Sequence, residues 1–391
     1  MSATQPKDAS LDTLSLASGA GAAPASATRE FVHLSVHTEF SLVDSTVRIK
    51  PLAKQVAGSM PAIAVTDRAN LFALVKFYRA ALASGIKPLI GVDLRVVGAL
   101  PDGEITRVIL LVQDDAGYLN LTRLVSRSFQ EGQGGGEPVV ELDWVLEANA
   151  GLIALSGGID GDVGHLLRRG RAEDALAAAR RWQGAFGDRY YLELTRCGRP
   201  DEESCLNGAC AIAMETGLGV VATNDVRFLA AADFPVHEAR LCIASGNVLA
   251  DPKRPRHVTE QQYLKSPAEM AVLFADLPVA LDNAVEIARR CNVTLKLGKP
   301  VLPDFPIPDG LTENEYFYAL AREGLEERLE QLYDTAAASF AETRKPYDER
   351  LQRELDVIAG MGFPGYFLIV ADFIGWSREN GVPVGPGRGS G

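Results

Sequence analysis

The sequence predicts an α/β fold built around a mainly parallel sheet. From residue 31 to about residue 230, short apolar runs alternate with segments whose apolar residues recur every three or four positions. Such alternation is typical of parallel strands connected by helices. The expected strands are 31–36, 62–66, 87–96, 106–112, 151–155, 190–194 and 219–223. This many strands over roughly 200 residues fits a closed TIM-like barrel at least as well as an open sheet.

Beyond residue 230 the strand signal ends and the pattern becomes helical. Residues 266–292 are expected to form helices, and the evenly spaced prolines of 296–310 indicate an extended linker. Residues 312–332 and 347–360 then have the spacing of amphipathic helices. The expected apolar face of the first comprises Tyr316, Leu320, Leu325, Leu329 and Leu332.

Length, charge and cysteine content exclude several protein classes. The 391 residues suggest two or three domains, and 39 basic against 51 acidic residues give a net charge of −12. By itself, this acidity argues against a nucleic-acid partner. No run of about 18 apolar residues predicts a membrane span. Five cysteines without a C-x-x-C motif indicate a reducing, cytoplasmic setting. Residues 1–29, rich in Ala, Ser, Thr and Gly, predict a disordered tail rather than a signal peptide.

Polar residues gather where the expected strands end. His33 and His37 flank the end of the first strand, Asp67 and Arg68 end the second, Asp93 lies in the third, and Asp225 and Arg227 follow the last. Carboxyl ends of parallel strands meet at one edge of a sheet, so these groups are expected to converge. His and Asp suit zinc or manganese. The alternative is that Asp67 and Asp225 only cap the following helices.

The second candidate site is the glycine-rich segment 385–391. Its alternating glycines would let backbone N–H groups turn toward an anion, with Arg388 and Ser390 as further donors. It is not a P-loop, because no Gly-Lys-[Ser/Thr] ending follows. On spacing alone, an ordinary turn or a frayed chain end remains the alternative.

Longer motifs point to one family. They are Ala64-Val65-Thr66-Asp67, Gly198-Arg199-Pro200-Asp201, Ala222-Thr223-Asn224-Asp225, Asp251-Pro252-Lys253-Arg254-Pro255, Gly362-Phe363-Pro364-Gly365-Tyr366-Phe367 and Pro383-Val384-Gly385-Pro386-Gly387-Arg388-Gly389-Ser390. Together they resemble the alpha subunits of bacterial DNA polymerase III, the replicative C-family polymerases. The resemblance extends from about residue 30 to the last residue.

This resemblance implies that residues 30–295 form a polymerase-and-histidinol-phosphatase (PHP) domain, a distorted (β/α)7 barrel. In some members the barrel holds a trinuclear metal site that removes mismatched nucleotides. Here the resemblance assigns the vestigial ligand positions to His37, Asp44, Asp67, Asp93 and Asp225.

Four histidines of a metal-competent member are replaced in this chain, by Ser35, Arg68, Arg107 and Arg227. A guanidinium carries fixed positive charge and cannot become a metal ligand. We therefore expect the three arginines to pair with the remaining aspartates, and the PHP metals to be absent.

The resemblance further implies that, after a linker at 296–310, residues 311–391 begin the palm, a nucleotidyltransferase-like α+β catalytic domain. Gly387, Arg388, Gly389 and Ser390 would hold the triphosphate of the incoming nucleotide. The implied reaction is two-metal transfer with Mg²⁺, whose paired aspartates are expected beyond residue 391.

The implied partners are primer–template DNA, deoxynucleoside triphosphates and a proofreading exonuclease subunit docked on the PHP domain. Later parts of the protein would bind other replicase subunits and the sliding clamp, and no membrane is involved.

Two other functions stay open: a metal-dependent 3′–5′ exonuclease or phosphoesterase, and a non-enzymatic interaction module. The net charge of −12 is compatible with a DNA-directed enzyme, because the inferred partner of the PHP domain is another protein.

Overall fold

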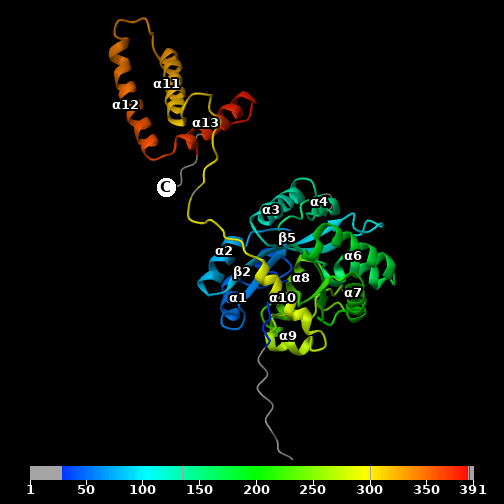
Figure 1. The fold of residues 1–391 in the computed structure, drawn as a ribbon. Helices are drawn as coiled ribbons and strands as arrows, with labels where there is room; N and C mark the ends of the chain where they lie inside the picture. The colour runs from blue at the N-terminus through cyan, green and yellow to red at the C-terminus, as the bar shows by residue number, and fades with distance from the viewer. Residues whose placement is uncertain (1–28, 134–135, 300, 386, 388–391) are drawn as a thin grey trace, which may run out of the picture. The chain divides into compact units, whose positions relative to one another are not determined.

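A computed structural model describes residues 29–133, 136–299, 301–385 and 387. They fall into two compact units, divided between Thr294 and Leu295 (Figure 1). The tail expected at 1–29 lies outside the described residues except for Arg29, and so do Arg388, Gly389 and Ser390 of the expected phosphate loop.

The first unit contains a seven-stranded sheet in the order β1-β2-β3-β5-β6-β7, with β4 paired to β2. The strands are β1 (Ala62–Arg68), β2 (Lys87–Val97), β3 (Thr106–Val112), β4 (Val140–Glu141), β5 (Leu152–Leu155), β6 (Tyr190–Thr195) and β7 (Gly219–Thr223). Six of the expected strands are confirmed to within two residues at each end, and β4 was not foreseen. The apolar runs are strands because they are buried on both faces of the sheet, as the fully buried β3 illustrates.

The sheet is mixed rather than mainly parallel around β3. This strand runs antiparallel to both β2 and β5, whereas the other pairs are parallel. The reason lies in the connection: residues 98–105 between β2 and β3 are too few for a helical crossover and form a hairpin. As a result, the beginning of β3 lies at the edge of the sheet where the neighbouring strands β2 and β5 end.

The first expected strand, 31–36, is an extended segment that closes the sheet. On one side it accepts hydrogen bonds from Ala64 and Thr66 of β1, at His33 and Val36. On the other side it is joined to Val226, just after β7, through Ser35 and His37. The prediction of a regular strand was wrong, because the Val36 N–H is donated to the Thr66 side chain instead of a backbone carbonyl. The segment nevertheless lies between the first and last strands, as in a distorted barrel.

Helices surround this sheet (Figure 1). They are α1 (Ile49–Val56), α2 (Leu74–Ala83), α3 (Asp115–Gln130), α4 (Leu142–Glu147), α5 (Asp162–Arg168), α6 (Ala172–Phe186), α7 (Glu202–Thr216), α8 (Phe234–Ser245), α9 (Pro267–Leu273) and α10 (Pro278–Arg290). The helices expected within 266–292 are confirmed as α9 and α10. A core cluster that includes Leu52, Ile63 and Phe77 packs α1 and α2 against β1.

The second unit contains α11 (Glu313–Leu332), α12 (Phe340–Gly360) and α13 (Pro364–Glu379), packed around Phe317, Leu355 and Leu368. The helix expected at 312–332 is confirmed, but its buried face differs, since Leu320 and Leu332 are exposed. The next helix begins at Phe340, earlier than expected, and contains Pro346. Among the described residues of this unit there is no strand, so the α+β palm stays a prediction.

No single helix among the described residues is long and apolar enough to cross a membrane. Helices α12 and α13 pass this test of length and composition only as a pair, bent by 115° at the break between them.

Candidate functional site: a buried arginine–aspartate cluster

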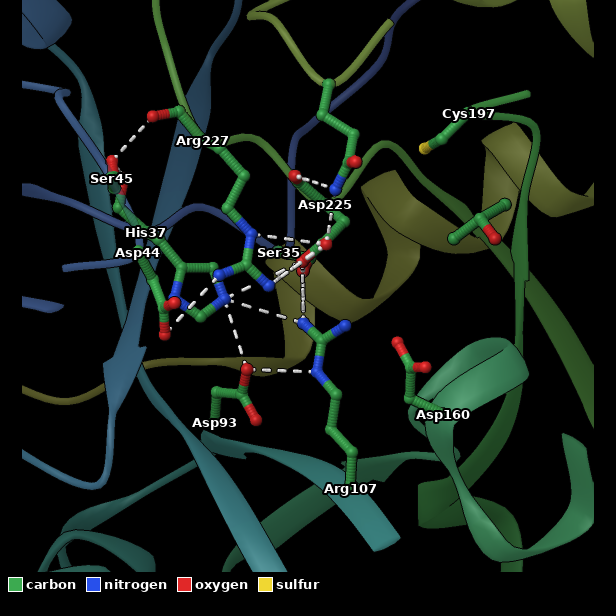
Figure 2. Close-up of polar contacts among 12 residues, drawn as sticks. Ser35, His37, Asp44, Ser45, Asp93, Arg107, Asp160, Cys197, Asp225 and Arg227 are labelled. Carbon is green, nitrogen blue, oxygen red and sulfur yellow. Dashed lines mark hydrogen bonds and ion pairs between the residues drawn. The ribbon is translucent and has the colours of Figure 1, made fainter. Parts of the chain in front are cut away.

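The polar residues expected at the strand ends do converge. Asp67 and Arg68 end β1, and Asp93 lies in β2. Arg107 is the second residue of β3, so the reversed direction of this strand brings its side chain to the same edge. Asp225 follows β7. Figure 2 shows the side chains of Asp93, Arg107 and Asp225 pointing toward one another.

Arg107 lies at the centre of the cluster. Its Nε is 2.9 Å from Asp93 Oδ2, and its Nη2 donates a 2.8 Å hydrogen bond to Asp225 Oδ1 (Figure 2). Asp93 is 1% exposed and Asp225 4% exposed. One guanidinium therefore bridges two carboxylates that water hardly reaches.

Arg227 and Arg68 extend the network. Arg227 Nη2 donates to Asp225 Oδ2 at 3.0 Å, and Arg227 also lies 3.8 Å from Asp44. Arg68 Nε lies 3.0 Å from Asp44 Oδ2. The expected pairing of the three arginines with aspartates is therefore present for Asp44, Asp93 and Asp225.

His37 joins the same network from the closing segment. Its Nε2 is 3.1 Å from Asp93 Oδ2 and 3.6 Å from Asp225 Oδ1, and the side chain is fully buried. Its Nδ1 lies 3.1 Å from Ser41 Oγ. Both ring nitrogens thus face protein atoms.

Asp67 is the exception to the arginine pairing. Its carboxylate accepts hydrogen bonds from the Thr38 N–H, the Thr38 hydroxyl and the Ser41 hydroxyl. The alternative that Asp67 and Asp225 cap the helices that follow them is wrong, because their carboxylates bind residues elsewhere in the chain. In the part of the chain that the structure describes, Asp67 is joined to the cluster through Ser41, which also contacts His37.

Burial and the guanidiniums act in opposite directions on the carboxyl pKa values. Burial alone would raise the pKa of Asp225, but Arg107 and Arg227 hold it well below the ordinary value. Burial likewise opposes the lowering of the pKa of Asp93 by Arg107 and His37. For His37, burial is the main cause that lowers the pKa, followed by the Arg227 guanidinium. The aspartates are therefore ionised and compensated by cations of the protein itself.

These residues do not fit the metal site that the resemblance to PHP domains implies. A divalent cation needs carboxylate and imidazole lone pairs that are free to coordinate it. Here Asp93 and Asp225 are already bridged by Arg107, and Asp44 by Arg68 and Arg227. Among the described residues, no group of three or more His, Cys, Asp or Glu side chains is arranged to hold a metal ion.

Ser35, which the resemblance placed at a former ligand position, lies with its Oγ 3.5 Å from Asp225 Oδ1. Sequence reasoning missed Gln262, whose Nε2 donates to Asp225 Oδ2 at 2.6 Å. Asp160 was missed as well, and it accepts two hydrogen bonds from Arg199. The sequence signal for Asp160 was an acidic residue just after the two glycines that follow β5.

Glu193 of β6 was also missed. It is 4% exposed and accepts a 2.6 Å hydrogen bond from the Thr223 hydroxyl on Oε1, while Oε2 has no hydrogen-bond partner among the described residues. Burial raises the pKa of Glu193 to about 7, although Arg107 and the Thr223 hydrogen bond oppose this. The apolar run that predicted β6 did not indicate a functional role for Glu193, because this residue only interrupts the run.

Little of the expected nucleotide-binding loop can be described. Gly387 is exposed and has a positive φ of 104°, and a Cβ there would meet no atom within 4 Å. Its neighbours Arg388, Gly389 and Ser390 lie outside the described residues.

Two protein families match separate parts of the chain. Residues 33–197 match the PHP domain family, and residues 315–391 match the family described as the bacterial DNA polymerase III alpha NTPase domain. The two matches fall in the first and second structural units respectively.

Whole-chain relatives are similar in sequence over nearly the same span. The DNA polymerase III subunit alpha of Pseudomonas fluorescens is 54% identical over 92% of this chain and 31% of its own length. Those of Pseudomonas aeruginosa and Escherichia coli K12 are 53% and 52% identical, over 93% and 92% of this chain. The chain spans about a third of the length of these relatives, 31% in each case.

Proposed function

Because this chain belongs to the family of bacterial DNA polymerase III alpha subunits, we propose that it acts in DNA replication as part of a DNA-directed DNA polymerase. The reaction proposed is template-directed transfer of deoxynucleotides to a primer 3′-OH in the cytoplasm. Since the chain spans 31% of its relatives, the activity is proposed for a protein of their length.

Divalent metal use is general to such polymerases, and Mg²⁺ is our specific proposal. The resemblance assigns Mg²⁺ to paired aspartates beyond residue 391. The contribution we propose for this chain is binding of the triphosphate by Gly387, Arg388, Gly389 and Ser390, whose backbone and side-chain donors suit phosphate oxygens.

Primer extension tests this part. A protein of the relatives' length is expected to incorporate nucleotides with Mg²⁺, and Arg388→Ala is expected to raise KM for the nucleotide. The matched control is Arg353→Ala, on an exposed part of α12. Residues 1–391 alone are expected to incorporate nothing, and Mg²⁺-dependent incorporation by them would overturn this division of labour.

For the first unit we propose a structural and docking role rather than catalysis. The observation that carries this proposal is the Arg107 guanidinium between the Asp93 and Asp225 carboxylates, 2.9 Å and 2.8 Å away. A fixed cation in that position supplies the charge that metal ions would bring, and it offers no Lewis acid and no bound water as a nucleophile.

Two measurements test the docking role. Purified chain is expected to carry no stoichiometric zinc or manganese and to leave DNA 3′ ends intact when either is added. It is also expected to co-elute with a purified proofreading exonuclease subunit. Stoichiometric metal together with hydrolysis would instead support the alternative, a PHP-type 3′–5′ exonuclease or phosphoesterase. Other replicase subunits and the sliding clamp are proposed partners of the longer protein only.

A further inference from the structure

A cavity of about 600 Å³ opens beside the arginine–aspartate cluster. The Asp44–Arg68 ion pair forms part of its lining, together with α8, the loop at Ser41–Asp44 and the segment 254–258. Its volume lies within the range of about 300–1,000 Å³ usual for sites that bind ligands. It is therefore large enough to receive a side chain and its neighbours from another molecule.

The cavity is apolar, and its rim exposes large hydrophobic side chains. Leu42 is 62% exposed, Phe72 63% and Phe129 40%, and all three line the cavity. Scattered exposed apolar residues need no explanation, but several around one hollow indicate a surface that is covered by a partner.

One arginine of the cavity lining has no acidic partner within the described ranges. Each acidic lining residue is paired with an arginine of the lining: Asp44 with Arg68, Glu137 with Arg95, and Glu238 with Arg254. Arg256 lines the same cavity, is exposed, and has no ion pair or side-chain hydrogen bond among the described residues.

We infer that this cavity binds a segment of a partner protein that carries an apolar side chain next to a carboxylate. The apolar side chain would enter between Leu42 and Phe72, and the carboxylate would pair with Arg256, whose planar donors suit it. The inference rests on the proposed docking role and adds where the partner docks and with what chemistry.

A second copy of this chain and a nucleic-acid strand are less complementary to this lining. The rim carries a single free guanidinium rather than the row of cations that tracks a phosphate backbone. A net charge of −12 also opposes self-association.

Calorimetric binding of the purified proofreading exonuclease subunit to the full chain tests the inference. Phe72→Ser and Arg256→Glu are each expected to weaken binding about tenfold or more, as for one anchor residue of an interface. The matched controls are Met214→Ser, at a side chain 83% exposed, and Arg123→Glu, at an exposed arginine, both outside the cavity. The controls are expected to bind as the unsubstituted chain does.

The outcomes separate the two proposals. If the unsubstituted chain does not bind the subunit, the docking role fails and this inference fails with it. If it binds but Phe72→Ser and Arg256→Glu bind equally well, only the cavity is excluded as the docking site. Sedimentation of the chain alone, or binding of a single-stranded oligonucleotide, that is lost in Phe72→Ser would overturn the inference in favour of a second copy or a nucleic acid.

Discussion

Arg107 Nη2 lies 2.8 Å from Asp225 Oδ1, and both side chains are almost completely buried. The two residues are 118 positions apart in the sequence and meet only because β3 runs opposite to its neighbours. Their ion pair joins the middle of the sheet to the closing edge, where Val226 bonds to the first segment. The cluster thus links the middle of the sheet to the segment that closes it.

Removal of Arg107 is expected to be costly. Arg107→Met keeps much of the volume but leaves Asp93 and Asp225 buried without their shared cation, so the free energy of unfolding should fall by about 3–5 kcal/mol. Urea unfolding measures it. The control is Arg171→Ala, which removes an exposed pair with Asp174 and should cost less than about 1 kcal/mol. Equal effects of the two substitutions would show that the buried pair has no special role.

Metal ions are expected to leave stability unchanged. The cations in this cluster are guanidiniums that a chelator cannot remove, so EDTA should not shift the thermal unfolding midpoint. Added zinc or manganese should not raise it either, because only a ligand that binds the folded state stabilises it. Thermal unfolding of the protein with EDTA, zinc or manganese added in turn, followed by metal analysis, measures the midpoint. A midpoint that rises with metal concentration would indicate a working site.

Most strand positions were predicted correctly from the sequence, but the direction of β3 was not. The apolar runs at 106–112 and 219–223 are long enough to be buried on both faces, and they mark β3 and β7 to the residue. The direction of β3 depends on the length of the connection before it. Counting residues 98–105, which include Pro101-Asp102-Gly103, would have indicated a hairpin.

Only part of the site could be predicted, because several of its contacts join residues far apart in the sequence. The resemblance placed Arg68, Arg107 and Arg227 at ligand positions among the aspartates, and their positive charge then predicted the pairing. Two uncharged partners of Asp67 and Asp225, Ser41 and Gln262, are 26 and 37 positions away in the sequence. Nothing in a strand or helix pattern encodes such contacts. The absence of metal from the five vestigial positions stays a prediction.

Acid is expected to unfold the first unit through its aspartates. The pKa of Asp225, Asp93 and Asp44 is lower in the folded protein than the ordinary value of 3.8. Stability from a lowered carboxyl pKa is present above the unfolded value and is lost as pH falls toward the folded value. The free energy of unfolding should therefore drop below about pH 5.

Urea unfolding at a series of pH values measures this drop, and Asp225→Asn should make it shallower. Asp174→Asn, at a carboxylate 54% exposed, is the control and should leave the slope as it is. A slope that Asp225→Asn does not change would mean that other groups govern acid unfolding.

Glu193 is expected to have the opposite effect on how stability depends on pH. Burial raises its pKa from 4.5 to about 7, so the folded protein keeps a proton that the unfolded chain has already released. The stability that depends on this proton is complete below pH 4.5 and is lost as pH rises through 7. Glu193→Gln keeps the acceptor for Thr223 and cannot ionise, so it should gain stability over the unsubstituted chain above pH 7 and lose the dependence between 4.5 and 7. The control is Glu215→Gln, at a side chain 54% exposed. Parallel pH profiles for Glu193→Gln and the unsubstituted protein would mean that Glu193 is ionised in the folded state, compensated by Arg107.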